Sequence, residues 1–140
     1  MNSSAKSPVS AEFSQRRLRL MELMGKNSIA ILPAAPVAVR NGGTEYAYRQ
    51  DSDLLYLTGF LEPHAVLVMI PGRKKGEVVL FCQDRDPATE LWTGYRAGPE
   101  GACNIYGADD AFPIGDIDEI LPGLLEEREK VFYAMGCNQT

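Results

Sequence analysis

"HAVLVMIPGRKKGEVVLFC" spans residues 64–82 and contains two apolar runs, residues 65–70 and 78–82, on either side of a polar turn. Branched aliphatic side chains dominate both runs, which is typical of β-strands. The turn contains proline, glycine and a run of basic residues, so it separates the two runs sharply. The stretch therefore predicts a β-hairpin whose two strands are buried.

Three further stretches predict extended structure around this hairpin. "SIAILPA", residues 28–34, is almost entirely apolar, which predicts a strand buried on both faces and ended by the following prolines. "VAVRNGGTEYAYRQ", residues 37–50, predicts an extended segment with a turn at residues 41–43. "KVFYAMG", residues 130–136, predicts a closing strand.

An apolar stripe predicts a first helix over residues 11–24, after a flexible lead formed by residues 1–10. Ser10 is placed to cap the start of this helix, and Gly25 is placed to end it. The stripe recurs at helical spacing and consists of Phe13, Arg17, Leu20, Met21 and Met24. The basic residues that we expect mostly off this stripe, on a solvated face, are Arg16, Arg17 and Arg19.

A capping signal predicts a short helical turn directly before the hairpin. Asp51 or Ser52 can cap its first amide groups, and Gly59 can close it. We expect the turn to be architectural, with its apolar side chains sealed against the sheet. These side chains are Leu54, Leu55 and Leu57.

Two more helices are expected in the second half of the chain. Asp86 caps one that has Pro87 at its first position and ends at Gly94. Residues 117–125 repeat apolar side chains at helical spacing, and Pro122 inside them predicts a kink or a restart. The capping box expected at the start of this helix is formed by Asp116 and Glu119.

Glycine and proline are frequent in residues 97–115, which predicts a loop there with one turn near Ala108. Short buried strands that alternate with helices favour an α/β fold. We therefore predict a single domain over residues 11–140, with a mixed β-sheet and helices on its faces.

The charge and composition of the chain argue against nucleic-acid-binding, membrane-spanning and secreted proteins. The net charge is −5, and residues 71–140 hold 13 acidic and 7 basic side chains, so a phosphate backbone would be repelled there. No apolar run approaches the roughly 20 residues of a membrane span. The polar lead lacks the apolar region of a secretory signal. We expect a cytoplasmic protein that binds neither nucleic acid nor membrane.

Few residues in the chain could carry chemistry. The single histidine, His64, and the widely spaced cysteines Cys82, Cys103 and Cys137 form no metal-binding or disulfide pattern. Phosphate-binding, zinc-protease and serine-hydrolase motifs are absent from the sequence. The residues alone indicate an α/β domain with no catalytic or metal-ligating set of its own.

Trp92 is the only tryptophan, and it lies near the end of the helix that Gly94 closes. One hypothesis is that it packs in the core, as single tryptophans usually do. The other is that it projects from the helix end to line the pocket of another subunit, as aromatic anchors do at interfaces. Periodicity does not separate these two hypotheses.

Three blocks of the chain carry a family resemblance. "EYAYRQDSDLLYLTGFLEPHAVLVMI" (45–70), "RDPATELWTGYRAG" (85–98) and "FSQRRLRLMELM" (13–24) each match a motif of Xaa-Pro aminopeptidases, also called aminopeptidase P. The blocks occur in the family order, and the resemblance covers residues 11–136. The chain is similar to the amino-terminal domain of that family, a small α/β domain with a mixed sheet that creatinase and prolidase share in outline.

The resemblance implies a partner domain and a reaction. In this family a carboxy-terminal pita-bread domain holds two metal ions, usually manganese, and removes the residue that precedes proline from a peptide. That domain and its metal ligands are absent from these 140 residues. We therefore expect the chain alone to be inert as a peptidase and to act with the pita-bread domain on proline-containing peptides.

The resemblance also implies site residues. In the family the amino-terminal domain supports a homo-oligomer, a dimer or a tetramer, and closes a neighbouring subunit's active-site entrance. Trp92 matches the tryptophan that reaches that neighbour's pocket, and Arg96 is expected to orient nearby carboxylates. Tyr46 and Arg49, with Tyr48, are expected to shape the rim. Gly43 stands in a loop where some relatives carry an acidic residue, so that contact with a substrate ammonium is not expected here.

Two alternatives stay open at this level. One is a standalone, non-catalytic binding or scaffold domain of the same fold. The other is the corresponding domain of a prolidase-like or creatinase-like enzyme, against which the block "RDPATELWTGYRAG" argues.

Overall fold

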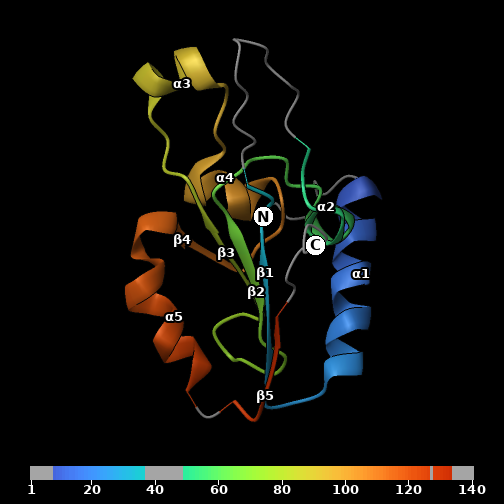
Figure 1. Ribbon diagram of the computed structural model, residues 1–140. Helices are drawn as coiled ribbons and strands as arrows, with labels where there is room; N and C mark the ends of the chain where they lie inside the picture. Colours follow the sequence, from blue (N-terminus) through green and yellow to red (C-terminus); the bar gives the residue numbers. More distant parts are fainter. Residues whose placement is uncertain (1–7, 37–48, 127, 134–140) are drawn as a thin grey trace.

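The structure is a computed structural model that describes residues 8–36, 49–126 and 128–133. Helices and strands alternate through it, and the strands form a single sheet (Figure 1). In chain order the elements are α1 (Pro8–Met24), β1 (Ser28–Pro33), α2 (Ser52–Thr58), β2 (Val66–Met69), β3 (Val78–Cys82), α3 (Pro87–Thr93), α4 (Gly98–Asn104), β4 (Asp110–Pro113), the 3₁₀ turn η2 (Ile114–Asp116), α5 (Ile117–Leu125) and β5 (Lys130–Tyr133).

The predicted hairpin forms the middle of the sheet, whose strand order is β4-β3-β2-β1-β5. β2 and β3 pair antiparallel, with Val66 opposite Phe81 and Met69 opposite Val78. β1 joins β2 antiparallel, whereas β5 and β4 add parallel to β1 and β3. The prediction of a mixed sheet with helices on its faces is confirmed.

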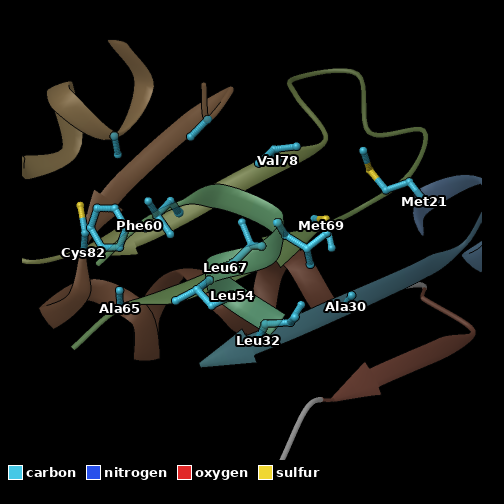
Figure 2. Close-up of a cluster of buried hydrophobic side chains, with 14 of the residues drawn as sticks. Met21, Ala30, Leu32, Leu54, Phe60, Ala65, Leu67, Met69, Val78 and Cys82 are labelled. Atoms are coloured by element: carbon cyan, nitrogen blue, oxygen red, sulfur yellow. The ribbon is translucent and has the colours of Figure 1, made fainter. Parts of the chain in front are cut away.

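The two faces of the sheet carry separate cores, which explains why the strand sequences are apolar without alternation. Leu67 and Met69 of β2 face one core, which α1, α2 and α4 cover. Val68 and Ile70 face the other core, which α5 covers. Figure 1 shows α1 and α2 on one side of the sheet and α5 on the opposite side, and Figure 2 shows the first core in detail. Burying one such side chain stabilises the fold by about 1.5–3 kcal/mol.

Helix α2 forms as its capping signals predicted. The carboxylate of Asp51 accepts a hydrogen bond from the amide of Leu54 at 3.0 Å. Gly59 ends the helix at φ +75°, and a side chain there would come within 2.8 Å of the Phe13 ring. Leu54 and Leu57 are buried, but Leu55 is 38% exposed, so the expectation that Leu55 seals the sheet is wrong.

Helix α1 departs from the prediction at both its start and its polar face. It begins at Pro8, so Ser10 lies inside the helix and is not its cap. Proline suits a first helical turn, where its missing N–H has no helical partner. Arg17 is buried, and its guanidinium donates to the carbonyl oxygen of Leu57 at 2.8 Å. Arg17 therefore joins α1 to α2 instead of facing solvent.

The expectation of a loop over residues 97–115 is wrong, because α4 and β4 both lie there. Pro99 falls in the first turn of α4, where proline is tolerated. β4 is a short strand that is stabilised by pairing with β3, a long-range contact that local sequence does not reveal.

Helix α5 bears on two further expectations, the effect of Pro122 and the capping box. It continues through Pro122 as one helix of nine residues, so the helix does not restart there, and the alternative of a kink stays a prediction. The side chain of Asp116 makes no capping hydrogen bond, so the capping box is not formed. The first turn instead follows η2, which leads directly into the helix.

Some predictions fall on residues outside those that the structure describes. They concern Tyr46 and Tyr48, the turn at residues 41–43, Gly43, Cys137 and residues 134–136 of the closing strand. Among the described residues, no helix is long and apolar enough to span a membrane.

We expect Leu54→Ala to lower the free energy of unfolding by about 2–5 kcal/mol, because the leucine is fully buried and its removal leaves a cavity. Leu55→Ala on the same helix is the matched control, and we expect a loss below about 1 kcal/mol. Urea unfolding followed by circular dichroism measures both. Equal losses would show that α2 does not seal the core through Leu54.

Candidate functional site

Residues 84–97, called the arm below, carry α3 away from the body of the domain. Figure 1 shows α3 standing clear of the sheet, joined to it by two extended connections. The arm begins just after β3 and ends just before α4. It contains no residue of either buried core except Ala97 at its end.

Glu90, which lies on α3, joins the two connections of the arm. Its carboxylate accepts hydrogen bonds from Arg85 Nε at 3.0 Å and from the Asp86 amide at 2.7 Å, both on the entering connection. It also accepts from the Arg96 amide at 3.3 Å, on the leaving connection. The hydrogen bond from Arg85 is the main reason that the pKa of Glu90 lies below its ordinary value.

Two glycines allow the backbone conformation and the close packing of the arm. Gly94 ends α3 at φ +103°, a conformation that other residues rarely adopt. Gly98 has φ +75°, and a side chain there would come within 2.8 Å of Cγ of Arg85. Arg85 also lies over the ring of Tyr95, 5.3 Å from its centre. The entering connection therefore packs against the start of α4.

Asp86 occupies the N-cap position of α3, as predicted, but its side chain does not form the capping hydrogen bond. It accepts instead from the Thr89 hydroxyl at 2.7 Å. The pKa of Asp86 lies below its ordinary value, chiefly because of this bond. The expected boundaries of the helix, Pro87 and Gly94, are confirmed.

Trp92 lies on the arm and is 88% exposed, so the hypothesis that it packs in the core is wrong. Its neighbour Leu91 is 84% exposed. The arm thus presents a large apolar surface that the described part of the domain does not cover. Exposed tryptophan at a braced position is typical of contact with another molecule.

Arg96 is half-buried at the base of the arm. Its guanidinium donates to the carbonyl oxygen of Asp84 at 3.2 Å, which links the leaving and entering connections a second time. Within the residues that the structure describes, it forms no ion pair with a carboxylate. As placed here, Arg96 braces the arm on which Trp92 projects.

A hydrogen-bonded chain connects the arm to the start of α2. Gln50 donates from Nε2 to the carbonyl oxygen of Glu62 at 2.8 Å, and its Oε1 accepts from the amides of Ala35 and Asp51, each at 2.9 Å. Glu62 Oε2 then accepts from the amide of Ala97 at 2.8 Å. Gln50 thereby fixes the segment next to Arg49 relative to the end of the arm.

Glu62 differs from Glu90 and Asp86 in the direction of its pKa shift. Burial raises its pKa above the ordinary value, against the opposing effect of its hydrogen bond from Ala97. Its second oxygen, Oε1, is buried and accepts no hydrogen bond in the structure. Sequence reasoning did not single out Glu62 or Gln50. Their presence in the block of residues 45–70 was the available signal.

The remaining predicted rim residues lie apart from Trp92 or outside the described residues. Arg49 is exposed just before Gln50. Tyr46 is not among the residues that the structure describes, so its position stays a prediction. The structure thus places Trp92 and Arg96 on the same arm. Arg49 is linked to the arm only indirectly, through its sequence neighbour Gln50.

The described residues offer no reactive nucleophile and no metal site. Burial raises the pKa of Cys82 to about 12, so this thiol stays protonated at neutral pH. In the same part of the chain, no three side chains of His, Cys, Asp or Glu converge to hold a metal ion. A metal ion does not fit the residues present here.

Comparison with known proteins identifies the domain type. The family model described as "Aminopeptidase P, N-terminal domain" matches residues 13–133. The Xaa-Pro aminopeptidase of Escherichia coli is 41% identical over 126 residues, which are 89% of this chain and 29% of that protein. The mitochondrial intermediate cleaving peptidase 55 of Arabidopsis thaliana is 37% identical over 87% of this chain and 24% of its own length.

Solved structures give the same result for the fold. The aminopeptidase PepP of Pseudomonas aeruginosa superposes with a TM-score of 0.87 at 63% identity, over 92% of this chain and 29% of that chain. A zinc-substituted Escherichia coli aminopeptidase P in complex with product gives a TM-score of 0.84 at 40% identity. The chain therefore spans less than a third of the length of these relatives.

We expect Glu90→Ala to loosen the arm without unfolding the domain, because Glu90 alone accepts from both connections at this point. Trp92 is the sole tryptophan, so its steady-state fluorescence anisotropy reports on the arm. We expect this anisotropy to fall in the variant, while the far-ultraviolet circular dichroism keeps its shape. Glu100→Ala, an exposed carboxylate on α4, is the matched control.

The hydrogen bonds of Glu90 also predict that the order of the arm depends on pH. A carboxyl group whose folded pKa is lowered stabilises the fold above its ordinary pKa and loses that effect as pH falls through the folded pKa. The anisotropy of Trp92 should therefore fall in acid, below the ordinary pKa of glutamate. Glu90→Ala should remove this transition, and its persistence in the variant would assign it to another group.

Proposed function

Because the chain belongs to the family of aminopeptidase P N-terminal domains, we propose that it is the amino-terminal part of a Xaa-Pro aminopeptidase. Such an enzyme removes the first residue of a peptide whose second residue is proline. The chemistry resides in a carboxy-terminal pita-bread domain with two manganese ions. The chain itself supplies a substrate-facing surface and no reacting group. Its place of action is the cytoplasm.

The arm is the part of this domain that we assign to the substrate. Within the motif of residues 85–98, Arg85, Glu90 and Arg96 hold the two connections together, and Gly98 makes room for Arg85. Trp92 is the largest side chain of the motif and packs on nothing in the described domain, since it is 88% exposed, and its neighbour Leu91 is 84% exposed. The contrast between the hydrogen-bonded residues of the arm and the exposed Trp92 is the observation that carries the proposal. A tryptophan that its neighbours hold in solvent is placed to contact another molecule.

We propose that this partner is the active-site entrance of a neighbouring subunit in a homo-oligomer. An indole offers a flat apolar face, which suits stacking on the pyrrolidine ring of a proline-containing peptide. The substrate carboxylate or backbone would then be oriented by residues of the enclosing site. Arg49 and Tyr46 are proposed at the rim of that entrance, and Arg96 positions the arm.

We expect the purified 140-residue chain to hydrolyse a Xaa-Pro peptide no faster than buffer, even with added Mn²⁺, because the described residues provide no metal-ligand cluster. Chromatographic detection of the released amino acid measures this, with the full-length protein as the positive control. Manganese-dependent turnover by the pure chain would contradict the assignment of catalysis to another domain.

We expect Trp92→Ala in the full-length protein to lower kcat/KM for Xaa-Pro peptides by about tenfold, corresponding to a lost stacking contact of roughly 1.4 kcal/mol. The thermal midpoint should be unchanged, since the side chain is exposed in the domain. Leu91→Ala is the matched control, because it removes an adjacent side chain of similar exposure. Full activity of Trp92→Ala would remove the arm from the substrate site and favour a domain that serves only as a scaffold.

A further inference from the structure

Glu62 lies where the arm joins the domain, in the short connection between α2 and β2. Its carboxylate oxygen Oε2 accepts a hydrogen bond from the amide of Ala97, the last residue of the arm, at 2.8 Å. The hydrogen bonds of Glu90 and Arg96 described above lie within the arm, so they hold its two connections to each other. The bond from Ala97 to Glu62 instead holds the arm to the domain.

The backbone of Glu62 is itself fixed to the core. Phe60, two residues earlier, is fully buried in the first core, and its ring packs edge-on against that of Tyr106 with 4.9 Å between the ring centres (Figure 2). Gln50 donates from Nε2 to the carbonyl oxygens of both Phe60 and Glu62, at 3.2 and 2.8 Å. The side chain of Glu62 therefore reaches the arm from a rigid base.

The carboxyl group of Glu62 is unfavourable where it lies. Its second oxygen, Oε1, is buried and has no hydrogen-bond partner among the described residues. The charged groups that it faces are Arg96 and Glu90 of the arm. The other titratable groups beside it are the thiol of Cys82 on β3 and the hydroxyl of Tyr106, whose pKa values its charge helps to raise. Burial outweighs the favourable effects of its neighbours, so the pKa of Glu62 itself is raised.

Stability alone does not explain a charged group at this position. A neutral side chain of the same shape, such as glutamine, would offer the Ala97 amide an acceptor and would place no charge in a buried site. The carboxylate offers a firmer contact, because hydrogen bonds to ionised acceptors are about twice as strong as those between neutral groups. A contact that lowers stability but holds a neighbouring segment more firmly is typical of a functional site.

We propose that Glu62 is a positioning residue, whose hydrogen bond to Ala97 fixes the direction in which the arm presents Trp92. This role rests on the proposed function, because it takes the arm to contact the substrate. Ala97 lies at the base of the arm, whereas Trp92 lies in α3 at its far end (Figure 1). A small rotation at Ala97 therefore moves the indole by a larger distance, and a displacement of about 1 Å in a substrate site can lower the rate by about a hundredfold.

The first test follows the arm in the 140-residue chain through the fluorescence anisotropy of Trp92, its sole tryptophan. Glu62→Ala removes the acceptor, so we expect the anisotropy to fall. Glu62→Gln keeps an acceptor but loses the charge, so we expect a smaller fall together with a higher thermal midpoint at neutral pH. Arm order and stability would then change in opposite directions, which a merely structural residue does not produce. Glu100→Ala, an exposed carboxylate on α4, is the matched control.

The pH profile separates Glu62 from Glu90. The pKa of Glu62 is raised and that of Glu90 is lowered, so Glu62 is protonated first on acidification and its bond to Ala97 weakens first. The anisotropy of the unchanged chain should therefore fall in two steps, one above and one below the ordinary pKa of glutamate. Glu62→Gln should remove the upper step alone. Its gain in thermal midpoint should vanish below that step, where Glu62 is neutral in the unchanged chain as well.

The second test measures kcat/KM on a Xaa-Pro peptide in the full-length protein. We expect Glu62→Ala to lower kcat/KM by about tenfold, as Trp92→Ala does, because a misdirected indole is lost to the substrate. In the double variant we expect a further loss of less than about twofold, since a residue that acts through another adds nothing once the other is removed.

Two results would overturn the inference and leave the proposed function intact. Unchanged anisotropy in Glu62→Ala would show that the arm is held without Glu62, and additive losses in the double variant would show that Glu62 affects turnover by another route. If Glu62→Ala does not fold, the absence of the upper pH step in the unchanged chain would overturn it equally. A fall in anisotropy with full activity of both Glu62→Ala and Trp92→Ala would instead overturn the proposed function, and the positioning role with it.

Discussion

Burial of both faces of a narrow sheet is the constraint on which the rest of this structure depends. β2 and β3 have adjacent side chains that face opposite cores, so neither strand has a polar side that could meet water. Helices must therefore cover both faces, and the alternation of helices with strands along the chain provides them. The position of α1 and α2 on one face and α5 on the other follows from this requirement (Figure 1).

The rigid sheet also explains how a residue can be held far from the core. The arm leaves from the end of β3 and returns at the start of α4, and both of these elements are packed on the sheet. Glu90 and Arg96 close the gap between the two connections through backbone groups, which fixes the arm without an apolar core of its own. An arm fixed in this way also fits the proposed role of Trp92, because a pre-ordered residue loses less conformational freedom when it makes a contact.

Electrostatics divides the carboxyl groups of this region into two kinds. Glu90 is surrounded by hydrogen-bond donors, and these donors hold its pKa below the ordinary value. Glu62 lies deeper, where burial raises its pKa and one oxygen lacks a partner. The hydrogen bonds to Glu90 stabilise its charged form, which holds the two connections together. Burial of Glu62 next to the amide of Ala97, at the point where the arm joins the domain, disfavours the charged form of that carboxyl group.

The sequence by itself determined the elements that are encoded locally. The hairpin, the capped helix α2 and the limits of α3 were predicted because apolar runs, capping residues and glycines act within a few positions of one another. The family was also evident from the blocks around residues 45–70 and 85–98. Only the tertiary structure decided the burial of Arg17, the exposure of Leu55 and Trp92, and the existence of β4. Whether a side chain is buried, or a short segment becomes a strand, depends on partners distant in sequence, such as Leu57 for Arg17 and β3 for β4. Those contacts form only when the chain has folded, so no local pattern records them.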